Sequence, residues 1–343
     1  MVRRAFAPNR GAGTCAIRCG LCPKVINPRP VAYNYPIMED IEKAVDAGDG
    51  FMVRNLTVFP LFRRDGGSLS LRTLDEAVAS GGAVLHETGQ VPWVDLEVGT
   101  DGGQPVFIMD GEGLVAGRQN RVVNTAVLAE AGLTHRIPVT CVEQGRWSGE
   151  GGFRAGSSAY PSLRAILAES VSASLRGGRG FSADQGAVWS SVKQKLSSLR
   201  VTSATSSMHD AYSGVARALS AFKEGFNLDG ASGFIAFAGD ELLGLDLLPG
   251  PEVMAKLREK VAESYALDAM GRMDRASRFL SRDEAVTVLR RVSRLKWREF
   301  PAVNLGQELR GDNDDLVARS LVRDGELVSL SAFVRAVEAG VEA

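Results

Sequence analysis

The hydrophobic period of this chain changes near its middle, and this change limits the folds that the chain can adopt. Between Met52 and about Glu143 the apolar segments are short, rich in β-branched or aromatic residues, and bounded by Gly, Asp or Pro. Such segments are typical of strands. We expect one short helix, 74–79, and strands at 53–59, 83–87, 93–98, 106–109, 121–128 and 136–142.

After a Gly/Ser-rich loop at 148–160, apolar residues recur at helical spacing in the stretches 188–199 and 208–226. A hairpin is expected at 233–247, turning at Gly239-Asp240. Two more helices are expected, from Pro251 onward and at 283–294. Closing strands are expected at 297–303, 316–321 and 327–333, the last two joined through Arg323-Asp324-Gly325.

The sequence therefore predicts an α+β or mixed α/β fold. A β-rich N-terminal half, 38–147, precedes a helix-rich α/β half with closing strands, 161–335. Short strands occur at both ends of the chain and could complete one sheet. The two halves are thus either separate domains or one continuous domain.

Residues 1–37 mix Arg, Pro, Gly and Asn without any hydrophobic period, and we expect a disordered tail. Met38 opens an acidic-headed segment, 38–48, that is expected to be a short helix, and translation could start there. The spacing of Cys15, Cys19 and Cys22 in the tail resembles the cluster loop of radical SAM enzymes. A polar leader precedes it instead of a strand, so a solvated tail is the favoured interpretation.

The charge balance argues against a bulk nucleic-acid binder, because 40 basic residues face 41 acidic ones. Eight arginines between 272 and 298 could form a basic stripe, but a solvated face is favoured. The chain has no apolar run long enough to span a membrane and no apolar signal segment. A cytoplasmic protein is expected.

A glycine motif, Gly111-x-Gly113-x-x-x-Gly117, follows the strand expected at 106–109. A dinucleotide fingerprint needs a spacing one residue shorter and a helix after the last glycine. Here Val122 and Val123 favour a strand instead. The glycines are therefore expected to shape a turn or bulge.

That turn nevertheless concentrates polar side chains between apolar strands. Amides, guanidinium groups and acids within the segment 110–124 form a set of donors and acceptors suited to a polar ligand. On a strand, Gln119 and Arg121 share one face. The alternative is an inter-strand polar network that satisfies buried backbone.

A second polar string, Cys141-Val142-Glu143-x-x-Arg146-Trp147, follows the strand expected at 136–142. Glu143 and Arg146 are candidates to line the same pocket as Arg121. Cys141 is expected to be a buried structural residue, because His135 lies roughly 20 Å away along an extended strand. The three histidines occur singly, so no metal site is expected.

The runs DGEGLVAGRQNRVVNTAVLAEAG, IPVTCVEQGRW, SLRVTSATSSMHDAY, FAGDELLGLDLL and ESYALDAM together resemble one family over about residues 51–333. It is the bacterial and archaeal domain named for its gene association with ADP-ribosylglycohydrolases and rhodanese-phosphatase-superfamily proteins. The resemblance implies a role in NAD or ADP-ribose metabolism, without an assigned reaction.

We expect a ligand-binding or hydrolytic protein that takes a small nucleotide or ADP-ribose-type ligand in a pocket around 110–124. Glu112 and Glu143 are the candidate catalytic residues, acting as a general base. The candidate ligand-binding residues are Asp110, Gln119, Asn120, Arg121, Asn124, Arg146 and Trp147. The alternative is a non-catalytic interaction module for partner enzymes or modified macromolecules, which predicts an exposed apolar patch. Cofactors and oligomeric state do not follow from the sequence.

Overall fold

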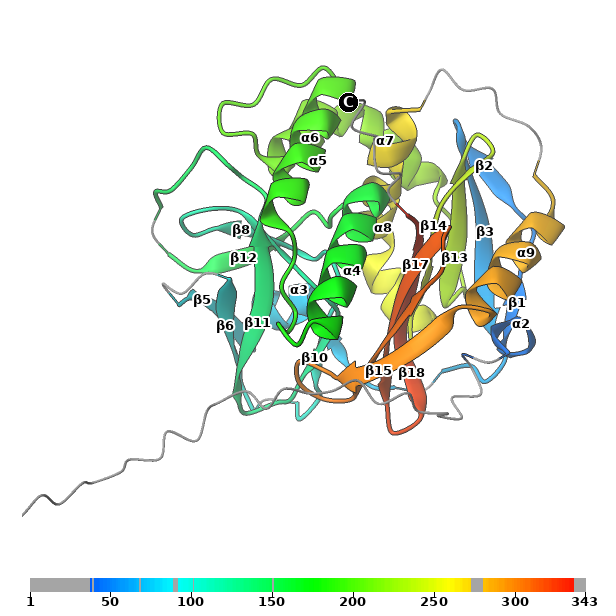
Figure 1. Ribbon diagram of the computed structural model, residues 1–343, viewed down its shortest axis with the longest axis horizontal. Helices are drawn as coiled ribbons and strands as arrows, with labels where there is room; N and C mark the ends of the chain where they lie inside the picture. Colours follow the sequence, from blue (N-terminus) through cyan, green and yellow to red (C-terminus); the bar gives the residue numbers. More distant parts are fainter. Residues whose placement is uncertain are drawn as a thin grey trace, which may run out of the picture.

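The computed structural model describes residues 38, 40–67, 69–88, 92–100, 102–149, 151–272 and 280–335. The predicted α+β class is confirmed: a long antiparallel sheet and a small closed barrel lie on either side of a pair of helices (Figure 1). The tail with Cys15, Cys19 and Cys22 lies outside the described residues. Within them, no helix is both long and apolar enough to cross a membrane.

The large sheet combines strands from both ends of the chain. Strand β3 pairs antiparallel with β13, and β14 pairs with β18. N-terminal and C-terminal strands therefore hydrogen-bond within one sheet. Its order is β1 (Val45–Ala47), β3 (Leu56–Arg63), β13 (Gly233–Ala238), β14 (Glu241–Leu247), β18 (Glu326–Val334), β17 (Leu316–Arg323), β16 (Gln307–Asp312) and β15 (Lys296–Pro301), with β2 (Phe51–Val53) on β3.

The barrel has an apolar interior filled by alternate residues of its strands, such as Leu96, Leu114 and Val139. Its strands, in order, are β11 (Thr134–Cys141), β6 (Trp93–Val98), β5 (Ala83–Glu87), β12 (Phe153–Gly156), β8 (Gly113–Ala116) and β9 (Arg121–Val123). A three-stranded sheet contains β10 (Val127–Ala129), β7 (Val106–Ile108) and β4 (Arg72–Thr73).

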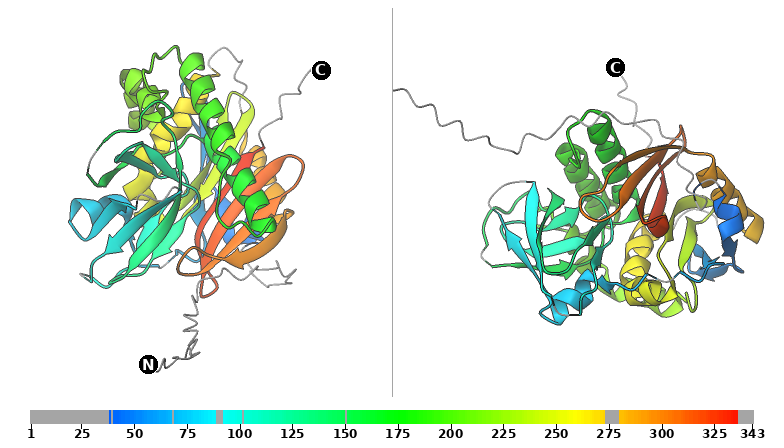
Figure 2. Two further views of the ribbon diagram at one scale, coloured as in Figure 1. Left: turned by 60° about the vertical axis from the view of Figure 1, so that its left-hand side comes forward. Right: turned by 90° about the horizontal axis from the view of Figure 1, so that it is seen from below.

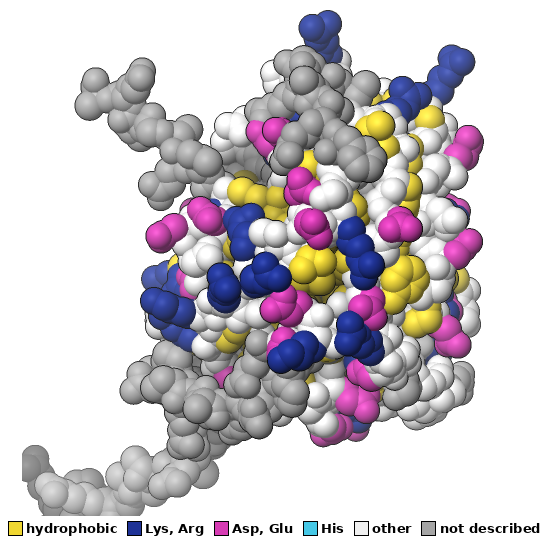
Figure 3. Space-filling model, turned by 90° about the vertical axis from the view of Figure 1, so that its right-hand side faces the viewer, with side chains coloured by type: hydrophobic (Ala, Val, Ile, Leu, Met, Phe, Trp, Pro, Cys, Tyr) yellow, Lys and Arg dark blue, Asp and Glu magenta, His cyan; other side chains and the backbone are white. Residues whose placement is uncertain are grey.

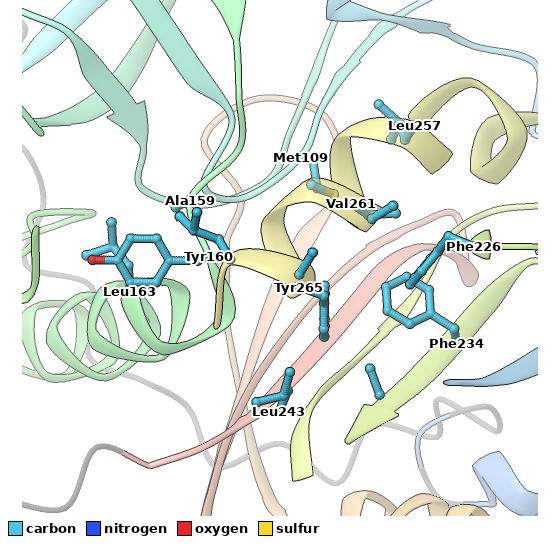
Figure 4. Close-up of a cluster of buried hydrophobic side chains, with 14 of the residues drawn as sticks. Met109, Ala159, Tyr160, Leu163, Phe226, Phe234, Leu243, Leu257, Val261 and Tyr265 are labelled. Carbon is cyan, nitrogen blue, oxygen red and sulfur yellow. The ribbon is translucent and has the colours of Figure 1, made fainter. Parts of the chain in front are cut away.

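Helices α4 and α8 lie between the barrel and the large sheet, as two views show (Figures 1 and 2). In the largest apolar cluster, Tyr265 of α8 lies between Tyr160 and Leu163 on one side and Phe226 and Phe234 on the other (Figure 4). The helices are α2 (Ile41–Ala44), α3 (Leu74–Ala79), α4 (Pro161–Arg176), α5 (Gln185–Ser198), α6 (Met208–Gly214), α7 (Ala216–Gly225), α8 (Pro251–Met270) and α9 (Arg282–Ser293).

Two expected strands are interrupted in the structure. The strand expected at 53–59 is a hairpin, because Arg54 has a φ of 57° and turns the chain between β2 and β3. The strand expected at 121–128 is two strands in different sheets, β9 and β10. Between them Thr125 donates a hydrogen bond to Glu308 of the large sheet, which draws the chain out of the barrel.

Other elements differ from the sequence-based expectation in length or kind. The helix expected at 38–48 ends at Ala44, since β1 pairs with β3 immediately afterwards. The apolar face at 208–226 belongs to two helices, which meet at Val215. Helix α4 and strand β16 were not expected, because their buried faces carry Arg164, Glu308 and Arg310 among the apolar residues.

Candidate functional site

One mouth of the barrel is lined by charged side chains instead of apolar ones. Arg121 opens β9 and stands directly opposite Cys141, the last residue of β11. Because Val123 and Val139 point into the barrel core, the same alternation directs Arg121 and Cys141 inward. Glu87, the last residue of β5, accepts a 2.7 Å hydrogen bond from Arg121 Nη2.

The guanidinium of Arg121 is buried, with 3% of its surface exposed, yet only partly bonded. Within the described part of the chain its Nε and Nη1 have no hydrogen-bond partner. Its carbon Cζ lies 5.8 Å from the ring centroid of Phe153. Burying unpaired donors costs free energy, so this position lacks an acceptor that a ligand or water would supply.

Next to Arg121, the Glu143 carboxylate is held by a ring of donors. It accepts hydrogen bonds from the backbone N–H of Asn120 at 3.0 Å, from Arg146 Nη2 at 2.6 Å and from Thr205 Oγ1 at 2.8 Å. Burial alone would raise the pKa of Glu143, but these bonds lower it below its usual value. Glu143 is therefore a fixed anion.

Arg146 and Trp147 form the rim of this region. Arg146 Nη1 donates to the carbonyl of Gly117 at 2.7 Å, and the pKa of Arg146 is raised, chiefly by its hydrogen bond to Glu143 and also by the charge of Glu87. Trp147 is 61% exposed. We name as the barrel-mouth cluster the residues Glu87, Gln119, Asn120, Arg121, Cys141, Glu143, Arg146 and Trp147.

Gln119 and Asn120 have different places in this cluster. Gln119 Nε2 donates to the carbonyl of Glu143 at 2.7 Å, while its Oε1 is buried and unpartnered among the described residues. Asn120 donates to Ser207 Oγ at 3.2 Å and accepts from the backbone N–H of Ala116. Both the amide nitrogen and the amide oxygen of Asn120 are thus hydrogen-bonded within the cluster and its surroundings. The amide oxygen of Gln119 is not.

Asp110 lies elsewhere, in a buried network of three acids and three arginines. Arg164 of α4 bonds Asp246 of β14 through two 2.7 Å contacts and Asp110 at 3.1 Å. Arg319 also donates to Asp110, at 2.8 Å. Burial would raise the pKa of Asp110, but the two arginines hold it well below its usual range. Glu308 and Arg310, 2.8 Å apart, complete this buried ion network.

Glu112 and Asn124 are also separate from the barrel mouth. Glu112 forms an ion pair with Lys260 of α8, and Lys260 pairs with Asp75 at 2.5 Å. Burial, opposed by Lys260, raises the pKa of Glu112 to about 6. Asn124 accepts from Thr140 Oγ1 at 2.6 Å. The backbone carbonyl of Glu112 accepts a hydrogen bond from the N–H of Val123. Val123 is three residues from Asn120, which is roughly 10 Å along an extended chain. Glu112 therefore lies away from the barrel mouth.

Five of the nine predicted site residues therefore meet at the barrel mouth, with Trp147 exposed next to Arg146 in the chain, and Asp110, Glu112 and Asn124 do not. The glycines have structural roles. A Cβ on Gly113 would lie 2.1 Å from the carbonyl oxygen of Ser157, and Gly117 has a φ of 57°. Strand β9 follows them, not a helix.

Sequence reasoning missed Glu87, Thr205 and the partners of Asp110. Asp246 carried the clearest available signal, since it interrupts the apolar run 242–248 in a strand that is buried. Thr205 and Glu87 carried none, because polar residues at the ends of strands and in loops are common.

The arginines between 272 and 298 do not form a uniform basic surface. Arg290 pairs with Glu42 and Arg291 with Asp315. Figure 3 shows basic and acidic side chains intermixed on the face that carries α9. Arg275 and Arg278 lie outside the described residues. In the part of the chain that the structure describes, no group of three or more His, Cys, Asp or Glu is arranged to hold a metal ion.

Three cavities of about 540–590 Å³ are lined by residues outside the barrel-mouth cluster. The first extends along α4 and α5, the second lies beside the β17–β18 turn, and the third lies at the end of α8. None of these three cavities is lined by a residue of the cluster, and the side chain of Arg121 at the mouth is 3% exposed.

The fold and this rim define a class of α+β proteins in which a small barrel with a charged mouth is joined to a long antiparallel sheet. Residues 44–333 match the model of the ARPP-1 family, the ARG and Rhodanese-Phosphatase-superfamily-associated Protein domain. The chain belongs to this family. Comparisons with curated proteins and with solved structures found no match.

Proposed function

We propose that the protein binds an ADP-ribose-type ligand at the barrel mouth. The observation that carries this proposal is the buried guanidinium of Arg121, whose Nε and Nη1 have no partner among the described residues. The forked N–H groups of a guanidinium match the oxygens of a phosphate and can bind two of them at once. The family is named for its association with ARG and rhodanese-phosphatase-superfamily proteins, and this association supports an ADP-ribose ligand.

The neighbouring groups fit the remaining parts of such a ligand. Arg146 brings a second positive charge, with 26% of its side chain exposed. The unpartnered Oε1 of Gln119 can accept a hydrogen bond from a ribose hydroxyl. The exposed ring of Trp147 offers a surface on which adenine can stack. Barrel mouths are common places for small-molecule sites.

Binding fits this geometry better than hydrolysis. A general base needs a free lone pair and a pKa near the working pH. Glu143 is bonded by three donors and its pKa is lowered, so it is a weak base. Glu112 has a pKa of about 6 but is paired with Lys260 away from the mouth.

The test is a calorimetric titration of the full chain with ADP-ribose. We expect saturable binding that Arg121→Gln and Arg146→Gln each weaken about ten-fold or more, the effect of one lost charge-assisted contact. Arg136→Gln is the matched control, since Arg136 is 58% exposed near the opposite end of β11 and should leave the affinity unchanged.

Thermal unfolding of each variant shows whether it is folded at the titration temperature. If Arg121→Gln unfolds, Arg146→Gln tests the same site from its rim. The proposal fails if the wild type does not bind ADP-ribose, or if folded variants bind it as the wild type does. Chromatography of the titrated ligand shows whether any cleavage accompanies binding.

A second candidate function is a non-catalytic interaction module, and the exposed Trp147 favours it. Tryptophan is enriched at the centres of protein interfaces, and this one is 61% exposed. If Trp147→Ala leaves ADP-ribose binding unchanged while removing binding of an ADP-ribosylated peptide, the mouth recognises a modified macromolecule.

A further inference from the structure

A cavity of about 540 Å³ lies where the end of α8, the end of β18 and the start of β14 meet α4 and α9. Three arginines from three different elements line it: Arg272 after α8, Arg291 in α9 and Arg335 after β18. None of these belongs to the barrel-mouth cluster or to the buried ion network. Guanidinium groups from distant parts of the sequence thus converge on one hollow.

Each of these arginines meets a carboxylate at the long end of the hydrogen-bonding range or just beyond it. The shortest distances are 3.6 Å from Arg272 Nε to Glu241, 3.4 Å from Arg291 Nη2 to Asp315 and 3.2 Å from Arg335 Nε to Glu169. Charge-assisted N–H···O bonds are normally 2.7–2.9 Å. Arg335 Nη1 also donates to the carbonyl of Asn313 at 3.2 Å, and each guanidinium, with five N–H donors, keeps donor capacity beyond these contacts.

Arg272 shows this capacity most directly. Its Nη1 is buried and has no hydrogen-bond partner within the described residues. The neighbouring Lys195 is paired instead, because its Nζ lies 2.5 Å from Asp268. Arg272 Nη1 is thus a donor that lacks an acceptor at this place.

Two acids line the cavity, Glu241, which faces Arg272, and Asp268, and the second does not oppose an incoming anion. Asp268 accepts hydrogen bonds from the backbone N–H of Ser162 at 2.7 Å and from Ser162 Oγ at 2.9 Å, in addition to Lys195. Its charge is neutralised by this set. The backbone of Ser162 also places the start of α4, where the helix dipole is positive, at the wall of the cavity.

We propose that this cavity is a binding site for a phosphate-bearing small molecule, recognised by Arg272, Arg291 and Arg335. Forked N–H groups from several arginines match the tetrahedral oxygens of a phosphate and give its orientation. The volume admits a phosphorylated sugar or a larger metabolite. The site is separate from the barrel mouth and does not depend on the function proposed for it.

The experiment is a titration of the full chain with inorganic phosphate, followed by calorimetry in phosphate-free buffer. We expect one saturable site whose dissociation constant rises about ten-fold or more in Arg272→Gln and in Arg291→Gln. Arg290→Gln is the matched control, because Arg290 precedes Arg291 on α9, pairs with Glu42 and does not line the cavity. Its affinity should equal that of the wild type.

Hydrogen exchange on the unaltered protein locates the bound phosphate without any variant. Protection at 241–243, 268–272 and 334–335 supports the proposal, whereas protection confined to 117–121 and 143–147 assigns the phosphate to the barrel mouth and overturns it. The proposal also fails if no saturable binding is seen, or if folded Arg272→Gln and Arg291→Gln bind phosphate as the wild type does.

Discussion

Arg164 is a buried arginine whose guanidinium lies between two carboxylates. It is 1% exposed, and its guanidinium bonds two carboxylates, Asp110 and Asp246. Its Cζ also lies 4.6 Å from the ring centroid of Phe333. A buried ion group of this kind adds little stability over a well-packed apolar core, but removing one partner leaves the other charges uncompensated.

We therefore expect Arg164→Met to destabilise the protein by about 3–5 kcal/mol, because it leaves two buried carboxylates short of a cation. The measurement is the free energy of unfolding from urea denaturation. Arg176→Met on the same helix is the control, since Arg176 and Asp312 form a partly exposed pair worth about 0–1 kcal/mol. Equal losses in the two variants would contradict the role given to Arg164.

Glu112 predicts a pH dependence of stability. Burial raises its pKa from 4.5 to about 6, so between these values the folded protein holds a proton that the unfolded chain has released. Stability from this group is complete below about pH 4.5 and is lost as the pH rises through 6. The loss is about 2 kcal/mol, at 1.36 kcal/mol per pKa unit.

The measurement is the unfolding free energy of the wild type minus that of Glu112→Gln, at several pH values from 4 to 7. This difference should fall by about 2 kcal/mol across the range, because glutamine does not titrate. Lys260 titrates far above it, since its pKa is raised from 10.5. A difference that stays flat from pH 4 to 7 would show that Glu112 titrates normally.

At the scale of elements, sequence alone located those whose limits are set by local chemistry. Helix α3 and strands β5, β6 and β13 have the bounds that their turn residues and period predict. Elements whose limits depend on distant partners were misplaced. Strand β9 ends where Thr125 reaches Glu308, a contact between residues 183 positions apart. No local pattern records such a contact.

Helix α3 shows how local chemistry defines an element. Thr73 and Glu76 form a capping box, in which each side chain bonds the other residue's backbone N–H. We expect Thr73→Ala to lower the unfolding free energy by about 1 kcal/mol. Ser80→Ala, at the other end of the helix, is the comparison, because Ser80 Oγ donates to the carbonyl of Ala77 and takes no part in the capping box. Two equal effects in urea denaturation would exclude the capping box as the cause.

The whole molecule explains why only part of the candidate site was predictable. The segment 110–124 contains all of β8 and β9 and the residues that flank them. Its polar residues are therefore divided between opposite ends of the barrel. The prediction that residues close in sequence share one site was correct for Gln119, Asn120 and Arg121, which lie in and next to one turn. It failed for Asp110 and Glu112, because a strand separates residues at about 3.3 Å per position.

The buried ion network joins the parts of the fold that the sequence presents as two halves. Asp110 and Thr125 come from the chain around the barrel, Arg164 from α4, and Asp246 and Arg319 from the large sheet. Strand β3 also pairs with β13 across the two halves. Unfolding either half alone would break that pairing and expose unpaired charges in the other. We therefore expect a single cooperative transition.

The chain offers natural probes for this expectation, because its four tryptophans include Trp93 in β6 of the barrel and Trp297 in β15 of the large sheet. In two variants that each keep one of these and replace the other three by Phe, fluorescence should give the same urea midpoint and the same slope. Adding Arg164→Met should lower both midpoints together, because the network belongs to both parts. Midpoints that separate in either background would show that the barrel and the sheet unfold independently.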